Sequence, residues 1–160
     1  MRNIKDFGVD ARLVRTFRTK DGKGYKGWIY ETPSGYRFYF SIRDEKKHEY
    51  RNWKSWGIDI EIFDEINKMF PLLVDLPRSI IIYEENQMIF YHMDWHRFAP
   101  ESHRLKNYDG RKNCDGDQYQ LSIGAWDMAT KLSDIVSPGG KKKKTKYQTR
   151  LEDNGIDGIK

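Results

Sequence analysis

The sequence predicts an α+β protein, in which an antiparallel β-meander and a β-hairpin supply about six strands and one or two helices pack on one side. Three observations predict this class. Residues 1–43 hold three β-prone runs separated by glycine-containing turns. Residues 58–70 then change to a helical spacing of apolar side chains. Finally, two more β-prone runs flank the polar turn at 84–87.

The meander is predicted from runs 12–19, 25–31 and 36–43. Gly22, Gly24 and Gly35 supply turn residues that tolerate a positive φ, and Pro33 fixes φ at a central turn position. In the third run two sets of side chains alternate: Tyr36, Phe38, Phe40 and Ile42, then Arg37, Tyr39, Ser41 and Arg43. Because a strand sends alternate side chains to opposite faces, the first set is expected in the core and the second outward.

The segment 58–70 fits two structures. Its first half alternates like a strand, but Ile58, Ile62, Ile66 and Phe70 recur at the spacing of one helix face. A helix ended by Pro71 is the favoured interpretation. Further along, runs 79–83 and 88–98 are expected to pair as the hairpin. A long loop over 99–117, a strand over 119–125 and a short helix over 126–136 complete the expected elements.

The order of elements also permits an oligonucleotide-binding (OB-like) barrel, which places a helix between its third and fourth strands. We expect one domain over 1–136 and a lysine-rich tail over 137–160, since a Ser-Pro-Gly-Gly break precedes four consecutive lysines. The single cysteine excludes an intrachain disulfide, and the apolar runs are far shorter than a membrane span. A cytoplasmic or otherwise intracellular location, with no membrane partner, is therefore expected.

Charge is distributed unevenly along the chain. Residues 1–56 hold 14 Lys and Arg against 7 Asp and Glu, residues 57–136 hold 8 against 14, and residues 137–160 hold 7 against 3. A basic front and a basic tail point to an anionic partner, although the acidic middle could neutralise part of this charge after folding.

The favoured function is binding of DNA or RNA through contacts to the phosphate backbone. Cations alternate with aromatic rings in the meander, which suits phosphate contacts and base stacking, and the tail adds affinity that does not depend on sequence. The candidate residues are Arg15, Arg18, Lys20, Lys23, Lys26, Trp28, Arg37, Tyr39, Arg43, Lys141, Lys142, Lys143 and Lys144.

The second hypothesis is a metal-dependent nuclease or hydrolase. His92, Asp94 and His96 share one face of the expected strand, and two imidazoles with a carboxylate could bind a divalent metal. Further ligands could come from the loop: His103, Asp109, Cys114, Asp115 and Asp117. No HExxH, CxxC or Walker-type motif supports the site. The favoured interpretation of these three residues is an amphipathic strand whose polar face meets water.

The third hypothesis is a protein without catalytic activity, such as an accessory subunit or inhibitor of a larger protein or nucleoprotein assembly. The acidic middle and the basic ends would then form its interface.

Overall fold

The computed structural model describes residues 3–19, 21–43, 55–101, 103–105 and 118–136. A six-stranded sheet forms the centre, in the order β1-β2-β3-β5-β6-β9, and a three-stranded sheet has the order β4-β8-β7. The central strands are β1 Arg12–Arg18, β2 Tyr25–Glu31, β3 Arg37–Arg43, β5 Ser79–Glu84, β6 Ile89–Asp94 and β9 Asp127–Ala129. The small sheet comprises β4 Ser55–Asp59, β7 His103–Leu105 and β8 Gln118–Ser122.

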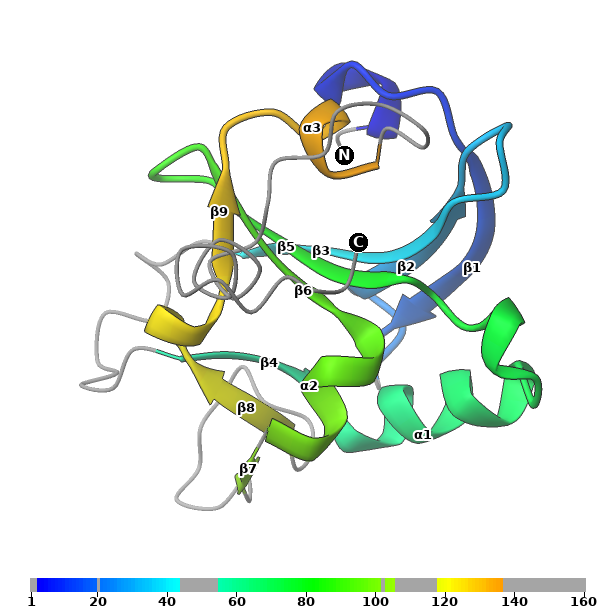
Figure 1. The fold of residues 1–160 in the computed structure, drawn as a ribbon, viewed down its shortest axis with the longest axis vertical. Coiled ribbons are helices and arrows are strands. Elements are labelled where there is room, and N and C mark those ends of the chain that lie inside the picture. Colours follow the sequence, from blue (N-terminus) through cyan, green and yellow to red (C-terminus); the bar gives the residue numbers. More distant parts are fainter. Residues whose placement is uncertain (1–2, 20, 44–54, 102, 106–117, 137–160) are drawn as a thin grey trace, which may run out of the picture.

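The helices are α1 Ile60–Met69, α2 Trp95–Glu101 and α3 Ser133–Val136. Short 3-10 turns cover Ile4–Phe7, Leu73–Asp75 and Ile123–Ala125. The α+β class with mostly antiparallel pairing is confirmed, and in the described part of the chain the strands do not close into a barrel. Figure 1 shows α1, α2 and the small sheet on one side of the central sheet, and α3 with the N-terminal turn on the other. No helix among the described residues has the length and apolar character needed to cross a bilayer.

The three meander strands form where the sequence predicts them, with antiparallel pairing throughout. The hairpin β5–β6 also forms, with Ser79 opposite Asp94 and Glu84 opposite Ile89. The meander and the hairpin are joined by one parallel pair, β3–β5, in which Phe38 lies opposite Ser79. A parallel pair requires a long crossover, and the chain between β3 and β5 contains β4 and α1 on the same side of the sheet.

Each face of the central sheet carries a hydrophobic core. The face under α1, which we call the α1 face, carries Phe17, Ile29, Tyr39, Ile80, Ile82, Tyr91 and Met93, packed against side chains of β4, α1, α2 and β8. The opposite α3 face carries Trp28, Phe38, Phe40, Ile81, Tyr83 and Phe90, packed against the N-terminal turn and α3. Sheets covered on two sides give strands that are apolar throughout, and all six residues of β5 are buried.

The expectation that Tyr39 and Ser41 face outward is therefore wrong. They are 1% and 0% exposed because the α1 face that they occupy is a second core. Their hydroxyl groups donate to the main-chain carbonyl of Lys26, at 3.4 Å from Tyr39 and 2.9 Å from Ser41. The polar atoms thus reach a partner inside the protein, as buried hydroxyls must.

The two interpretations of residues 58–70 each apply to part of the segment. Strand β4 ends at Asp59 and α1 begins at Ile60, so Ile58 is buried as a strand residue. Ile62 and Ile66 are buried on the helix face that the spacing predicted. The helix ends at Met69, two residues before the proline, as expected.

Four other predicted elements differ from the structure. The loop predicted over 99–117 contains the end of α2 and all of β7, and the strand predicted over 119–125 ends as β8 at Ser122, followed by the 3-10 turn Ile123–Ala125. The run 88–98 is a strand only to Asp94, and Trp95 begins α2. Most of the helix predicted over 126–136 is absent: residues 127–129 form β9, which pairs with β6, and α3 covers only 133–136. Pairing with β9 satisfies main-chain groups of β6 that would otherwise be left without partners, and this tertiary requirement outweighs the local helical preference.

Close packing at Gly27 gives a stability prediction. A Cβ atom at this position would lie 2.8 Å from Cε2 of Tyr39 and still closer to the ring hydroxyl. We expect Gly27→Ala to lower the free energy of unfolding by about 1–3 kcal/mol, because the ring is enclosed by the α1-face core and cannot retreat. Urea denaturation measures the change.

Gly124→Ala is the matched control, since a Cβ there would meet nothing within 4 Å. Equal stability of the two variants would show that Tyr39 adjusts to the methyl group without cost.

Candidate nucleic-acid interface and sheet-edge groove

The pairing of β1 with β2 is irregular near the turn that joins these two strands. Phe17 lies opposite Gly27 and Arg18 opposite Tyr25, so Lys26 is an extra residue, a β-bulge. Regular alternation would put Tyr25 and Trp28 on opposite faces, but the bulge brings them to the same one. Their rings stack with centroids 5.7 Å apart and planes inclined by 27°.

Arg18 extends this stack. Its guanidinium carbon lies 5.0 Å from the centroid of the Tyr25 ring. Tyr25 is 41% exposed, whereas Trp28 beneath it is 7% exposed. The result is a cation on an exposed ring that rests on a buried ring, and we call Arg18, Tyr25 and Trp28 the hairpin stack.

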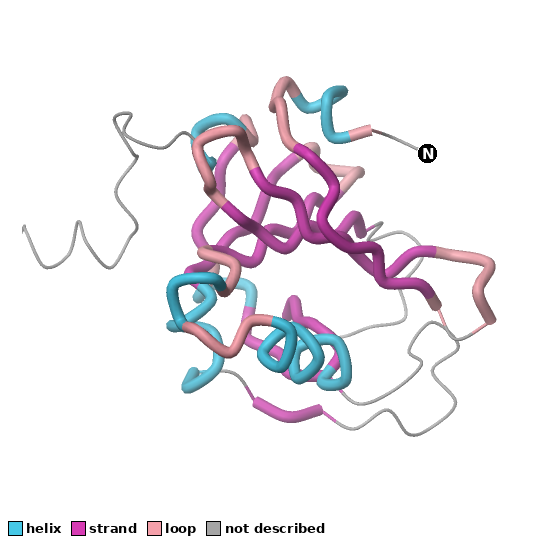
Figure 2. Tube along the Cα trace, turned by 90° about the vertical axis from the view of Figure 1, so that its right-hand side faces the viewer, coloured by secondary structure: helices cyan, strands magenta, loops and turns pink. Residues whose placement is uncertain are grey.

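The turn between β1 and β2 has a defined set of hydrogen bonds. Thr19 donates from its hydroxyl to Asp21 at 2.6 Å, and the main-chain N–H of Lys23 donates to the same carboxylate oxygen at 2.9 Å. The bond from Thr19, and then that from Lys23, lowers the pKa of Asp21. Gly22 has φ 72°, in the left-handed region that glycine favours. Figure 2 shows the β1–β2 hairpin extending beyond the helices at this end of the sheet.

Most other cations predicted to bind nucleic acid are engaged within the protein. Arg15 pairs with Glu65 of α1 at 2.5 Å, and Lys26 pairs with Asp59 at the end of β4. Arg43 donates to the carbonyl of Gly57 at 3.4 Å.

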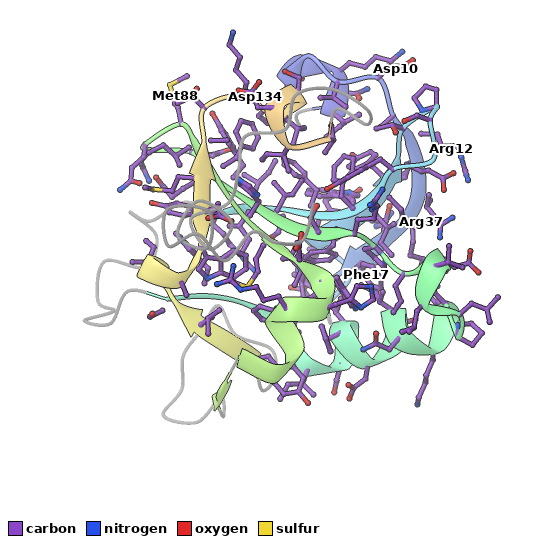
Figure 3. All side chains as sticks on the ribbon, viewed as in Figure 1. Asp10, Arg12, Phe17, Arg37, Met88 and Asp134 are labelled. Atoms are coloured by element: carbon purple, nitrogen blue, oxygen red, sulfur yellow. The ribbon has the colours of Figure 1, made fainter. Side chains whose placement is uncertain are left out.

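Arg37 lies beside Arg12 at the sheet end opposite to the hairpin turn (Figure 3). Both guanidinium groups bind Glu31, at 2.7 Å from Arg37 and 2.5 Å from Arg12. The hydrogen bond from Arg12, helped by the charge of Arg37, lowers the pKa of Glu31 against the opposing effect of burial.

The predicted interface is thus smaller than the sequence suggested. Arg18, Lys23 and Trp28 come together at the hairpin end, and Lys20 and the tail lysines 141–144 lie outside the described residues. Tyr39 is buried and cannot stack on a base. The ring that sequence reasoning missed is Tyr25, whose position depends on a bulge that periodicity does not reveal.

A second candidate site is a groove of about 1050 Å³ at the other end of the sheet, where β3 and β5 begin and β6 ends. Its lining includes Tyr36, Arg78, Ser79, His92, Asp94 and His96. The three residues predicted to bind metal therefore border one groove, although His96 reaches it from α2 rather than from the strand.

A metal centre is not formed by the described residues. Among them, no group of three or more His, Cys, Asp and Glu side chains could hold a metal ion. His96 leaves the strand face because β6 ends at Asp94. The predicted loop ligands Asp109, Cys114, Asp115 and Asp117, and the side chain of His103, lie outside the part that the structure describes.

Burial lowers the pKa of His92, while the carboxylates of Asp127 and Asp94 act in the opposite direction. Asp127 lies directly opposite His92 in the β6–β9 pair. The neutral imidazole is therefore favoured in the folded protein. This would suit a ligand or hydrogen-bonding role better than that of a permanent cation.

The shift at His92 predicts a pH dependence of stability. Because the unfolded chain takes up this proton at a higher pH than the folded chain, stability present above about pH 6.5 is lost as the pH falls towards the folded pKa. The free energy of unfolding, measured from about pH 7.5 to about pH 5.5, should fall less in His92→Gln than in the parent protein. Equal slopes, or a steeper slope in the variant, would contradict the assigned direction.

Comparisons with known proteins found no matching family model, no matching curated protein and no matching solved structure. Function is therefore inferred from the chain's own residues and their arrangement.

Proposed function

We propose that this protein binds nucleic acid, either DNA or RNA, by contacting the phosphate backbone through the β1–β2 hairpin and the lysine-rich tail. The observation that carries the proposal is the hairpin stack. It combines a stacked guanidinium with a partly exposed ring at an end of the sheet that extends beyond the helices.

The stack suits the two parts of a nucleotide. The Arg18 guanidinium, whose central carbon lies over the Tyr25 ring, can donate from its N–H groups to a phosphate. Because Trp28 stacks beneath Tyr25 and Arg18 lies over it, a base would stack on the outer side of the guanidinium or displace it from the ring. Stacking on an aromatic ring contributes about 1–3 kcal/mol per base. Trp28 supports the ring from below, so little ordering is required on binding.

Charge also favours this end of the sheet. Within the described ranges, no ion pair involves Arg18 or Lys23, both of which are exposed. Arg15, Lys26 and Arg37 already have carboxylate partners, so a phosphate would have to compete for them. The tail's Lys141–Lys144 would add contacts without sequence preference.

The hairpin contribution is tested by reversing two charges. Arg18→Glu with Lys23→Glu should lower affinity for single-stranded DNA or RNA by about tenfold or more at moderate salt, because two phosphate contacts are lost. Fluorescence anisotropy with labelled oligonucleotides, from about 50 to about 200 mM salt, measures both affinity and its salt dependence.

The matched control is Lys68→Glu with Lys131→Glu, which makes the same charge change at exposed positions on other elements. An equal loss in both double variants would indicate a general charge effect. If the parent protein failed to bind DNA or RNA even at low salt, the proposed function would be wrong.

The tail makes a separate prediction. Replacing Lys141–Lys144 with Gln should weaken binding to every sequence alike and reduce the slope of log affinity against log salt by up to about 3. Replacement with Arg keeps the charge and should preserve the slope. An unchanged slope in the Gln variant would exclude tail contacts with phosphate.

A further inference from the structure

We propose that the sheet-edge groove is a second binding site, which takes a nucleoside monophosphate. The site is separate from the hairpin stack because the two lie at opposite ends of β2: Tyr25 begins this strand and Glu31, at its other end, lines the groove. A volume of about 1050 Å³ is ample for a ligand of this size.

Arg78 supplies the phosphate contact. Its main-chain N–H donates to the carbonyl of Arg37 at 2.8 Å, and its carbonyl accepts from the N–H of Trp95 at 3.0 Å. The backbone is therefore held from both sides, and the guanidinium carbon lies 5.4 Å from the ring centroid of Tyr36. Arg78 is exposed and belongs to no ion pair among the described side chains. Carboxylates also line the groove, but none of those described forms an ion pair with Arg78, and a cation positioned in advance is suited to a phosphate.

Groups that hydrogen-bond to sugar and base lie beside this arginine. Ser79 is opposite Asp94 in the β5–β6 pair, and the hydroxyls of Ser79 and Tyr36 are 3.1 Å apart. Asp94 is exposed and borders the groove, where its carboxylate can accept from ribose hydroxyls or from an amino group of a base. The Asp94 carboxylate would repel a ligand that is only an anion. It therefore favours a ligand that also carries hydrogen-bond donors.

The groove has an apolar border as well. Leu73 and Val74 line it and are 72% and 84% exposed. Ile135 of α3 also lines it. A flat base placed against this border would remove apolar surface from water. An anion, several donors and an apolar ring are found together in a nucleotide, whereas inorganic phosphate or a sugar phosphate lacks one or more of them.

Isothermal titration calorimetry on the full chain tests the proposal with AMP, GMP, CMP and UMP. At least one should bind, and Arg78→Gln should weaken that binding by about tenfold or more through loss of the charged contact. Asp94→Asn should weaken nucleotide binding without weakening inorganic phosphate. If AMP is the ligand, adenosine and ribose 5-phosphate should each bind less tightly than AMP. If another nucleotide is the ligand, its own nucleoside replaces adenosine in this comparison.

Arg18→Gln is the control, because it changes the hairpin stack and leaves the groove intact. It should reduce binding of oligonucleotides but not of mononucleotides, so the two sites can fail independently. A thermal melt of each variant verifies folding, and Arg78→Met, which also removes the charge, replaces the Gln variant if that one unfolds. The proposal is overturned if no nucleotide binds at about 10 mM, if Arg78→Gln has no effect, or if ribose 5-phosphate binds as tightly as the nucleotide.

Discussion

The central sheet carries apolar side chains on both faces, and the need to cover both places the remaining elements. Every residue of β5 is buried, so apolar side chains project from both sides of the same strand. The α1 face requires α1, α2 and the small sheet to cover it, and the α3 face requires the N-terminal turn and α3. The β1–β2 hairpin extends beyond these covers, and the sheet-edge groove opens where β3 and β5 begin and β6 ends, so both positions are accessible.

Part of the uneven charge of the sequence is used in ion pairs within the folded protein. Arg15 and Lys26 belong to the basic front, and their partners Glu65 and Asp59 belong to the acidic middle. The first pair joins β1 to α1 and the second joins β2 to β4, so both hold the crossover segment against the meander. The asymmetry between sequence blocks is therefore partly neutralised in the folded protein. Exposed pairs such as Arg15–Glu65 contribute little to stability, but they do remove cations from the surface available to nucleic acid.

Local sequence predicted those elements that depend on local chemistry. The meander strands were found because alternation and glycine turns act within a few residues, and Arg18 and Lys23 followed from their positions there. The parallel β3–β5 pair, the change from β6 to α2 at Trp95, and β9 all depend on partners distant in the chain. Tyr25 was missed for the same reason, because its stacking on Trp28 requires the bulge at Lys26. Tyr39 was wrongly expected to face outward because the side chains that bury it come from distant elements such as α1.

The irregular pairing of β1 has one more consequence, for contacts between copies of the chain. Strand β1 is an outer strand of the central sheet, and its register shifts twice, between Leu13 and Arg15 and between Phe17 and Arg18. An incoming strand needs a straight row of evenly spaced main-chain donors and acceptors, and a doubly shifted strand rich in arginine does not offer one. The other outer strand, β9, has three residues. Both borders of the sheet therefore resist the edge-to-edge addition that leads to aggregation.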